Sequence, residues 1–353
     1  MSHILEVEGL TTVFDGDGGQ MTSADGISFY VDPGEIVCIV GESGCGKSVT
    51  SLSLMSLLGR GGKVRAGKAL FEGRDLLSMS EKELDKIRGD AVTMIFQDPL
   101  TSLNPVFTIG RQITESIRVH MHLDKEAAFK RAVSLLEKVG MPDAASVMKK
   151  YPHLLSGGQR QRIGIARALA LRPSVLLADE ATSGLDPQAT ASVLALLKRL
   201  RDEYQLAIVL ITHEMDAVRT AADAVAEIRD GTIVQYGRIE DLLARPDSLL
   251  GQQLLPLTPA AATHSDLLLR LSYRWDVPVA TDWISRLSQQ WALQIDLLGG
   301  HVEVINGRLA GRLQAGVRFQ GERLSPARLQ GLLAQLGITA EILDSAPLLR
   351  EAV

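Results

Sequence analysis

The sequence has few cysteines and no long apolar run, and each shortage excludes a class of protein. Cys38 and Cys45 are the two cysteines among 353 residues, too few for a disulfide scaffold or a four-cysteine metal cluster. This usage indicates a reducing compartment. The longest apolar runs, at 36–40 and 206–211, are far shorter than the roughly 18 residues that span a bilayer. Any role at a membrane therefore depends on a partner protein.

The sequence also lacks a basic excess and a secretory signal. Its 42 acidic and 37 basic residues give a formal charge of -5, whereas a dedicated nucleic-acid binder normally carries more bases than acids. The opening residues, MSHILEVEGL, have no basic stretch followed by an apolar core, so we expect no signal peptide. With 46% hydrophobic and 22% charged residues, the composition is typical of a folded protein with two or more domains.

Strand and helix patterns alternate along residues 1–254. Strands are predicted at 4–14, 26–31, 35–40, 175–178 and 207–211, and helices at 47–58, 159–171 and 187–204. This alternation predicts an α/β domain in which helices cover a parallel sheet. A polar stretch at about 98–160 interrupts the alternation and is predicted to be a helical insert.

A second, smaller domain is predicted after a linker. Residues 255–265 lose periodicity and contain two prolines, as linkers often do. Residues 266–345 then predict a strand, a helix, two strands near 293–298 and 301–319, a helix from Ser325, and a last strand at 338–343. The order β-α-β-β-α-β predicts a ferredoxin-like α+β domain.

The clearest motif is a glycine-rich loop between a predicted strand and a predicted helix. It matches the pattern G-x-x-x-x-G-K-S and comprises Gly41, Glu42, Ser43, Gly44, Cys45, Gly46, Lys47 and Ser48. Glycines let successive N–H groups and the helix N-terminus surround phosphate oxygens. Lys47 is predicted to reach the outer phosphates of a nucleotide, and Ser48 to bind Mg²⁺. The alternative, an ordinary glycine-rich turn, is disfavoured by the flanking strand and helix.

Two carboxylates follow another predicted strand. Asp179 and Glu180 come directly after the apolar run 175–178, at the sheet edge where open α/β folds bind ligands. Asp179 is predicted to hold Mg²⁺, and Glu180 to orient or deprotonate an attacking water. A strand that ends in Asp-Glu is more often solvated than catalytic, so this prediction depends on the glycine-rich loop upstream.

A third motif opens the helix predicted near residue 159. It consists of Ser156, Gly157, Gly158 and Gln159, and its hydroxyl, amides and helix end form a second anion site. A plain helix cap is the alternative for this motif alone. With all three motifs in order, the chain resembles the ATP-binding subunits of ABC transporters over about residues 4–254. The resemblance implies an ATPase that uses Mg²⁺ and dimerises head to tail, so that Ser156–Gln159 contact the ATP of the opposing subunit.

The same resemblance implies roles for further residues. Gln97 matches the Q-loop glutamine, which touches Mg²⁺ or water, and Asp186 matches the D-loop, which faces the opposing subunit. His213 matches the switch histidine that contacts the terminal phosphate, and with Glu180 it is expected to be catalytic. Phe14 lies where the family stacks an aromatic ring on adenine, although a lone Phe in a strand is as often part of the core.

Two groups of importers compete for the substrate assignment. The stretch MIFQDPLTSLNP at 94–105 is similar to peptide and nickel importers. DEATSGLDP at 179–187 and the ferredoxin-like tail resemble methionine importers, in which such a tail pairs across the dimer and binds the transported amino acid. We therefore expect an importer of methionine or a related amino acid with a C-terminal feedback sensor. A dipeptide, oligopeptide or nickel importer is the alternative, and a tail that only dimerises stays open.

The family resemblance also implies partners and a location. The partners are a second ATPase copy, integral-membrane permease subunits and, through these, an extracellular solute-binding protein. The chain is then expected at the cytoplasmic face of the cell membrane. The rival class is a soluble ABC ATPase acting on DNA or ribosomes, which usually has tandem cassettes or a long coiled coil; this sequence has one cassette and no heptad array.

Overall fold

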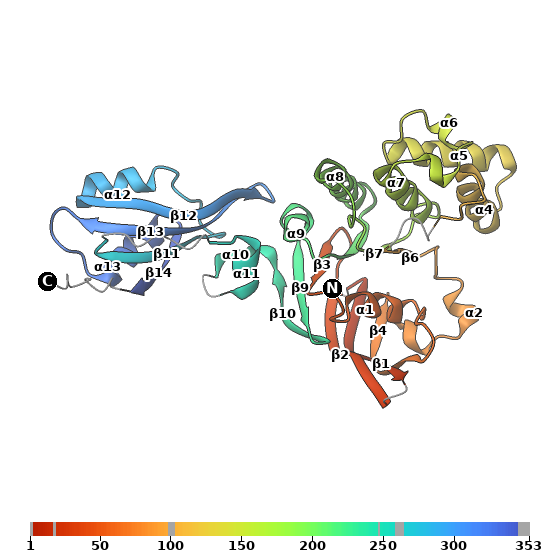
Figure 1. Cartoon of the computed structure of the whole chain (residues 1–353), viewed down its shortest axis with the longest axis horizontal. Coiled ribbons are helices and arrows are strands. Elements are labelled where there is room, and N and C mark those ends of the chain that lie inside the picture. Colours follow the sequence, from red (N-terminus) through yellow and green to blue (C-terminus); the bar gives the residue numbers. More distant parts are fainter. Residues whose placement is uncertain (1–2, 17–18, 98–102, 246–247, 258–264, 345–353) are drawn as a thin grey trace. The chain divides into compact units, whose positions relative to one another are not determined.

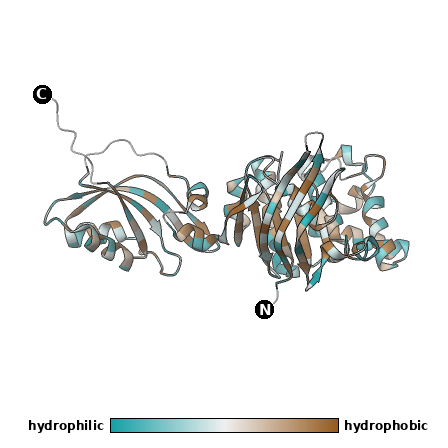
Figure 2. Ribbon diagram, turned by 90° about the horizontal axis from the view of Figure 1, so that it is seen from below, coloured by the Kyte–Doolittle hydropathy of each residue, from teal (hydrophilic) through white to brown (hydrophobic). Residues whose placement is uncertain are grey.

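A computed structural model describes residues 3–16, 19–97, 103–245, 248–257 and 265–344 of the chain. It divides into two compact units, residues 1–236 and 237–353 (Figure 1). In Figure 2 the hydrophobic colour follows the strands of both units, as expected for sheets that form the cores. Among the described residues, no helix combines the length and the apolar character needed to cross a membrane.

A six-stranded sheet forms the centre of the first unit. Its strands lie in the order β10-β9-β3-β8-β7-β6. They span Ile36–Val40 (β3), Val92–Ile95 (β6), Val175–Asp179 (β7), Ala207–Ile211 (β8), Ala224–Arg229 (β9) and Thr232–Arg238 (β10). The pairs formed by β3 with β8 and β9, and by β7 with β6 and β8, are parallel. The predicted parallel α/β sheet is therefore confirmed.

A second, antiparallel sheet packs into the same core. Its order is β2-β1-β4-β5, with β1 at Leu5–Gly16, β2 at Gly19–Val31, β4 at Gly62–Phe71 and β5 at Arg74–Asp75. Apolar side chains of both sheets, including Leu10, Phe71 and Val209, belong to one buried cluster. The first two strands are longer than the sequence predicted, because their pairing continues up to Gly16 opposite Gly19.

Several helices connect the strands of the first unit along the chain. They are α1 (Lys47–Leu54), α2 (Glu81–Leu84), α7 (Gly157–Ala168), α8 (Pro187–Tyr204) and α9 (Met215–Ala221), with short 3₁₀ turns at Leu76–Ser78 and Pro152–Leu154. Helix α1 ends four residues before the predicted end at residue 58. Ser56 has a left-handed φ of 50°, and the N–H groups of Leu57 and Ser56 bond to the carbonyls of Leu52 and Ser53. This Schellman pattern usually requires glycine, which is why the sequence did not reveal it.

The helical insert lies between β6 and β7. It contains α4 (Ile109–Met121), α5 (Lys125–Lys138) and α6 (Ala144–Val147) and leads into α7. Thr108 and Asp124 cap α4 and α5 through side-chain bonds to Arg111 and Ala127. The start of the predicted insert, at residues 98–102, lies outside the described residues.

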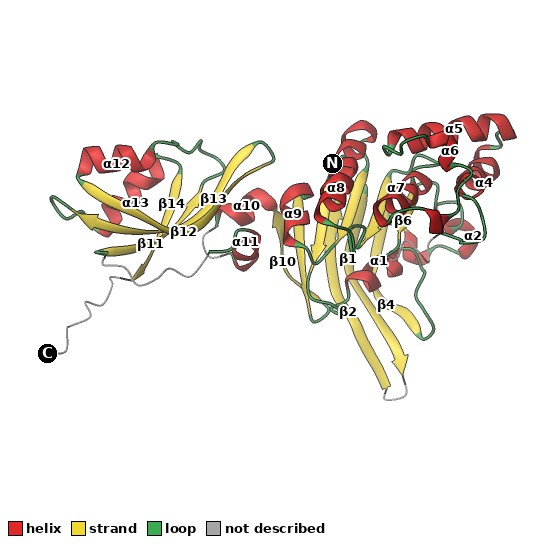
Figure 3. Cartoon of the chain, turned by 45° about the horizontal axis from the view of Figure 1, so that its top comes forward, coloured by secondary structure: helices red, strands yellow, loops and turns green. Residues whose placement is uncertain are grey.

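The second unit contains a four-stranded antiparallel sheet in the order β12-β13-β11-β14. It comprises β11 (Leu267–Tyr273), α12 (Trp283–Trp291), β12 (Leu293–Ile305), β13 (Arg308–Phe319), α13 (Pro326–Gln335) and β14 (Ile338–Asp344). Leu287 and Leu333 of the two helices share a buried cluster with Leu271 and Val317 of the strands, and Figure 3 shows both helices on one side of the sheet. This is the predicted ferredoxin-like arrangement.

The hairpin of this sheet turns later than the sequence predicted. We expected the turn at Gly299 and Gly300, but both lie inside β12, where the pairing with β13 shifts by one residue. The turn is formed by Asn306 and Gly307, whose φ angles of 48° and 76° suit a two-residue hairpin. Gly300 instead allows close packing, because a Cβ at this position would lie 2.4 Å from the Arg312 carbonyl oxygen.

Two short helices, α10 (Ile239–Ala244) and α11 (Leu249–Leu254), belong to the second unit. The buried Arg312 of β13 donates hydrogen bonds to the carbonyls of Arg245 and Ser248, between these helices. Contacts therefore divide the chain after Tyr236, whereas the prediction ended the first domain at residue 254. Most of the predicted linker, at 258–264, lies outside the described residues.

Candidate active site

The glycine-rich loop connects β3 to α1, as predicted. Gly41 and Gly46 have φ angles of 152° and 105°, and their lack of a side chain is required by close packing. A Cβ on Gly41 would lie 2.2 Å from the Ile228 carbonyl oxygen, and one on Gly46 would lie 2.2 Å from that of Ser23. Both are impossible contacts, so the loop geometry depends on glycine at these two positions.

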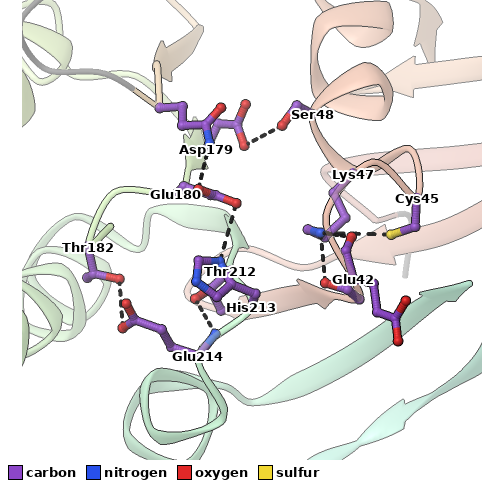
Figure 4. Close-up of polar contacts among 12 residues, drawn as sticks. Glu42, Cys45, Lys47, Ser48, Asp179, Glu180, Thr182, Thr212, His213 and Glu214 are labelled. Atoms are coloured by element: carbon purple, nitrogen blue, oxygen red, sulfur yellow. Dashed lines mark hydrogen bonds and ion pairs between the residues drawn. The ribbon is translucent and has the colours of Figure 1, made fainter. Parts of the chain in front are cut away.

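The side chain of Lys47 is folded back over this loop. Its ammonium donates hydrogen bonds to the carbonyls of Gly41, at 2.8 Å, and Glu42, and the residue is 5% exposed. The ammonium also lies 3.8 Å from the Cys45 sulfur (Figure 4). Backbone carbonyls thus hold the cation at the loop, where an incoming phosphate could replace them as its partner.

Ser48 and Asp179 bring two oxygen ligands together. The Ser48 hydroxyl, in the first turn of α1, donates to Asp179 Oδ1 at the end of β7 over 3.0 Å. Burial raises the pKa of Asp179, while the Ser48 hydrogen bond opposes the rise. A divalent cation would offset the cost of burying this carboxylate. The described residues contain no cluster of three or more His, Cys, Asp or Glu suited to a metal. The Ser48 hydroxyl and the Asp179 carboxylate suit Mg²⁺, which uses one or two carboxylates and takes its other oxygens from water and phosphate.

The Glu180 carboxylate contacts one side chain from the end of each neighbouring strand. Gln97, after β6, donates from Nε2 to Glu180 Oε2 over 2.7 Å, and His213 Nδ1, after β8, lies 3.4 Å from Oε1. These three predicted residues are far apart in the sequence. They meet because β6, β7 and β8 are adjacent parallel strands whose carboxyl ends share one edge of the sheet.

The backbone of Glu180 is unusual as well. Its φ of 46° is left-handed, a conformation that costs energy in a residue other than glycine and is found most often at functional sites. Its N–H donates to the Ile211 carbonyl over 3.0 Å, so the neighbouring strand supports the strained turn.

The third motif and the predicted D-loop lie together in this chain. Ser156 caps α7 and exchanges hydrogen bonds with Gln159. A Cβ on Gly158 would lie 3.3 Å from Ala189 of α8, and Asp186 caps α8 through the Ala189 N–H. These contacts fix the Ser156 motif and the Asp186 segment against each other. The role of each segment toward the ATP of an opposing subunit stays a prediction.

Phe14 lies on β1, between Met21 of β2 and Gly62 of β4. Its half-buried ring occupies the space above Gly62, where a Cβ would come within 2.7 Å. Adenine stacking by Phe14 stays a prediction.

Comparison with known proteins identifies the family. Residues 24–183 match the family model described as ABC transporter. The oligopeptide transport ATP-binding protein AppD of Bacillus subtilis is 45% identical over 269 residues, covering 76% of this chain and 82% of the relative. The chain belongs to the ATP-binding proteins of ABC transporters. It is therefore an ABC ATPase, as its motifs predicted.

Other relatives of this ABC ATPase are also named for peptides. The dipeptide transport ATP-binding protein DppD of Escherichia coli is 43% identical over 268 residues, with 76% of this chain and 82% of the relative covered. Among solved structures, the dimeric post-hydrolysis state of the cassette MJ0796 bound to ADP and Pi matches with a TM-score of 0.60 and 26% identity, covering 66% of this chain and 98% of that one. The relatives favour the peptide alternative, and methionine finds no support among them.

The motif analysis missed three residues beside the site. Thr182 donates a hydrogen bond to the Glu214 carboxylate over 3.4 Å, and the Glu214 N–H donates to the Thr212 hydroxyl over 3.0 Å. The one available signal was position, since Glu214 and Thr212 flank His213 and Thr182 follows Glu180 by two residues.

Proposed function

We propose that this ABC ATPase powers the uptake of small peptides. The observation that carries the ATPase mechanism is the convergence of Gln97, Glu180 and His213 beside the Ser48–Asp179 pair. The substrate class is supported by relatives named for oligopeptides and dipeptides. The expected methionine substrate is the weaker proposal, because the relatives reported above are named for oligopeptides and dipeptides and none for methionine.

Each residue of the site has a task in this mechanism. The loop amides from Gly41 to Lys47 and the Lys47 ammonium bind the phosphates, and Mg²⁺ would be held by Ser48, Asp179 and Gln97. The bound ion would neutralise charge on the β- and γ-phosphates. Glu180 orients and deprotonates the attacking water. The hydrogen bond from Gln97 holds the Glu180 carboxylate in place for this task. His213, which lies at the Glu180 oxygen that Gln97 does not contact, contacts the terminal phosphate.

Two copies are proposed to act together. The matching cassette structure is described as a dimer, and the Ser156 motif is held on the Asp186 segment rather than on the glycine-rich loop of the same chain. In the proposed dimer, Ser156–Gln159 and Asp186 of each copy complete the ATP site of the other.

The helical insert is the proposed contact for permease subunits, at the cytoplasmic face of the membrane. A cavity of about 620 Å³ lies between α4 and α5, lined by residues that include Gly110, Arg111, Phe129 and Met148. Phe129 is 41% exposed beside it, and an exposed aromatic side chain at a cavity is typical of a docking surface. An extracellular solute-binding protein would act through the permease.

The second unit is proposed to join the C-terminal parts of two copies. Strand β12 is at the edge of its sheet, and in the part of the chain that the structure describes no strand pairs with its outer side. It has no Lys, Arg or Pro, residues that commonly protect an edge strand, and Val302 and Val304 on it are 44% and 65% exposed.

The register indicates how two such strands would pair. Ile305 and Arg308 flank the two-residue turn, so Val302, opposite Gly311, is in a pair that makes no ladder bonds. Its N–H and C=O therefore point to the free edge. A two-fold axis at Val302 would place His301 opposite Glu303 of the partner subunit, an attractive pair.

Uptake assays test the proposed substrate class. In the source organism, replacing the gene by a Glu180→Gln copy should abolish uptake of a radiolabelled dipeptide and leave methionine uptake unchanged. Loss of methionine uptake with normal peptide uptake would overturn the proposal and restore the methionine alternative.

A further inference from the structure

The turns that follow β7 and β8 are joined twice. The two strands are parallel neighbours, with Asp179 opposite Ile211. The first connection is the 3.4 Å contact between Glu180 and His213. The second is the hydrogen bond from the Thr182 hydroxyl to the Glu214 carboxylate, on the side of His213 away from Ser48 (Figure 4).

The Thr182 side chain is buried, so the bond between Thr182 and Glu214 cannot be replaced by one to solvent. Thr182 is 1% exposed, so its hydroxyl depends on a protein partner, because a buried polar group without one is destabilising. Glu214 supplies that partner.

Glu214 is itself fixed at three points. Its carboxylate accepts from Thr182, and its N–H donates to the Thr212 hydroxyl over 3.0 Å. Its carbonyl accepts from the N–H groups of Ala217 and Val218 at the start of α9. The adjacent His213, by contrast, has a side chain that is 53% exposed. The direction of its ring therefore depends on the backbone that Glu214 holds.

We infer that Thr182 and Glu214 form a bracket that positions His213 against Glu180. Both are positioning residues, since they act through His213 rather than on ATP, and the inference rests on the proposed roles of His213 and Glu180. The His213–Glu180 and Thr182–Glu214 contacts both span 3.4 Å, at the limit of a hydrogen bond. Loss of the Thr182–Glu214 contact would leave the turn held by its backbone bonds, and a small shift would then separate His213 from Glu180 and from the terminal phosphate.

Matched variants of the full chain test the bracket in steady-state ATPase assays. Glu214→Ala and Thr182→Val should each lower kcat about tenfold, with the KM for ATP within about twofold of wild type. Glu214→Gln and Thr182→Ser retain an acceptor oxygen and a donor hydroxyl, so they should keep most of the activity. The double variant Thr182→Val/Glu214→Ala should be no slower than either single variant, because both remove the same interaction.

The outcomes separate this inference from the proposed function. An inactive wild-type chain would count against the ATPase mechanism itself. An active wild type together with unchanged kcat in the Ala and Val variants, or with additive losses in the double variant, would overturn the bracket. A rise in KM with constant kcat would also overturn it, since that pattern indicates a binding role. If Glu214→Ala fails to fold, the comparison of Thr182→Val with Thr182→Ser decides the question.

Discussion

Ser48 and Asp179 are 131 positions apart in the sequence, yet a 3.0 Å hydrogen bond joins the Ser48 hydroxyl to the Asp179 carboxylate. The contact closes the space between the first turn of α1 and the end of β7. Asp179 is 4% exposed and accepts a hydrogen bond from the neutral Ser48 hydroxyl. Burial outweighs this bond, so the pKa of the carboxyl is raised. The ionised Asp179 carboxylate is therefore destabilised by burial at the position where the bound cation is proposed to lie.

The raised pKa of Asp179 predicts a stability change with a definite sign. An acid whose pKa is higher in the folded state binds its proton more tightly there, so stability is lost as pH rises from the unfolded pKa through the folded one. At neutral pH, Asp179→Asn should therefore raise the Tm of the nucleotide-free protein and abolish the further rise that Mg·ATP gives wild type. Thermal unfolding with and without Mg·ATP measures both. A lower Tm in the nucleotide-free variant would contradict the burial argument.

Glu180→Gln should separate ATP binding from turnover. The amide keeps the size of the side chain but cannot take a proton from water, so kcat should fall by at least about 100-fold while ATP still binds. Slow turnover should also trap the proposed dimer, which size-exclusion chromatography in Mg·ATP would detect. A monomer with normal ATPase activity would rule out the assigned role of Glu180.

Lys47→Ala should weaken nucleotide binding itself. The ammonium is the one side-chain cation that the structure places on the loop carbonyls among the described residues, and its loss should raise the Kd for ATP by about 10-fold or more. Isothermal titration measures the change. Lys130→Ala is the matched control, because it removes an exposed lysine of α5 paired with Glu126; an equal loss in both variants would show a general charge effect.

The sequence revealed the parts of the site whose chemistry is local. The loop from Gly41 to Ser48 could be predicted because the spacing of its glycines, lysine and serine encodes a backbone shape. Asp179 and Glu180 could be predicted because they end an apolar strand downstream of that loop, and His213 because its motif resembles the switch histidine of the family. Their convergence required the strand order, in which β6, β7 and β8 are neighbours, and no local pattern encodes that order.

Tertiary contacts explain what the sequence left out. The Thr182–Glu214 bond joins two turns 32 positions apart, and neither residue type is distinctive. The hairpin turn was misplaced because a Gly-Gly pair and an Asn-Gly pair both favour turns. The pairing of β12 with β13 decides between them.

The proposed pairing of β12 across two copies predicts a cross-link at one position. Residues on a two-fold axis in a hydrogen-bonded pair lie about 5.5 Å apart between Cα atoms, within the range of a disulfide. Val302→Cys in the full chain should therefore form a covalent dimer under mild oxidation, as seen on a non-reducing gel.

Val304→Cys is the matched control for this experiment. It lies on the same face of β12 and is also exposed, but in the proposed register it faces Gly300 of the partner subunit. Two such cysteines are therefore offset by roughly 13 Å along the strands, at about 3.3 Å per residue. It should cross-link far more slowly than Val302→Cys. The wild type has Cys38 buried and Cys45 half-buried in the glycine-rich loop; it measures background cross-linking by these native cysteines and should stay monomeric on the gel. Equal cross-linking rates for the two variants would indicate random collision. The absence of a cross-link in Val302→Cys would overturn the proposed β12 pairing and leave the ATPase assignment intact.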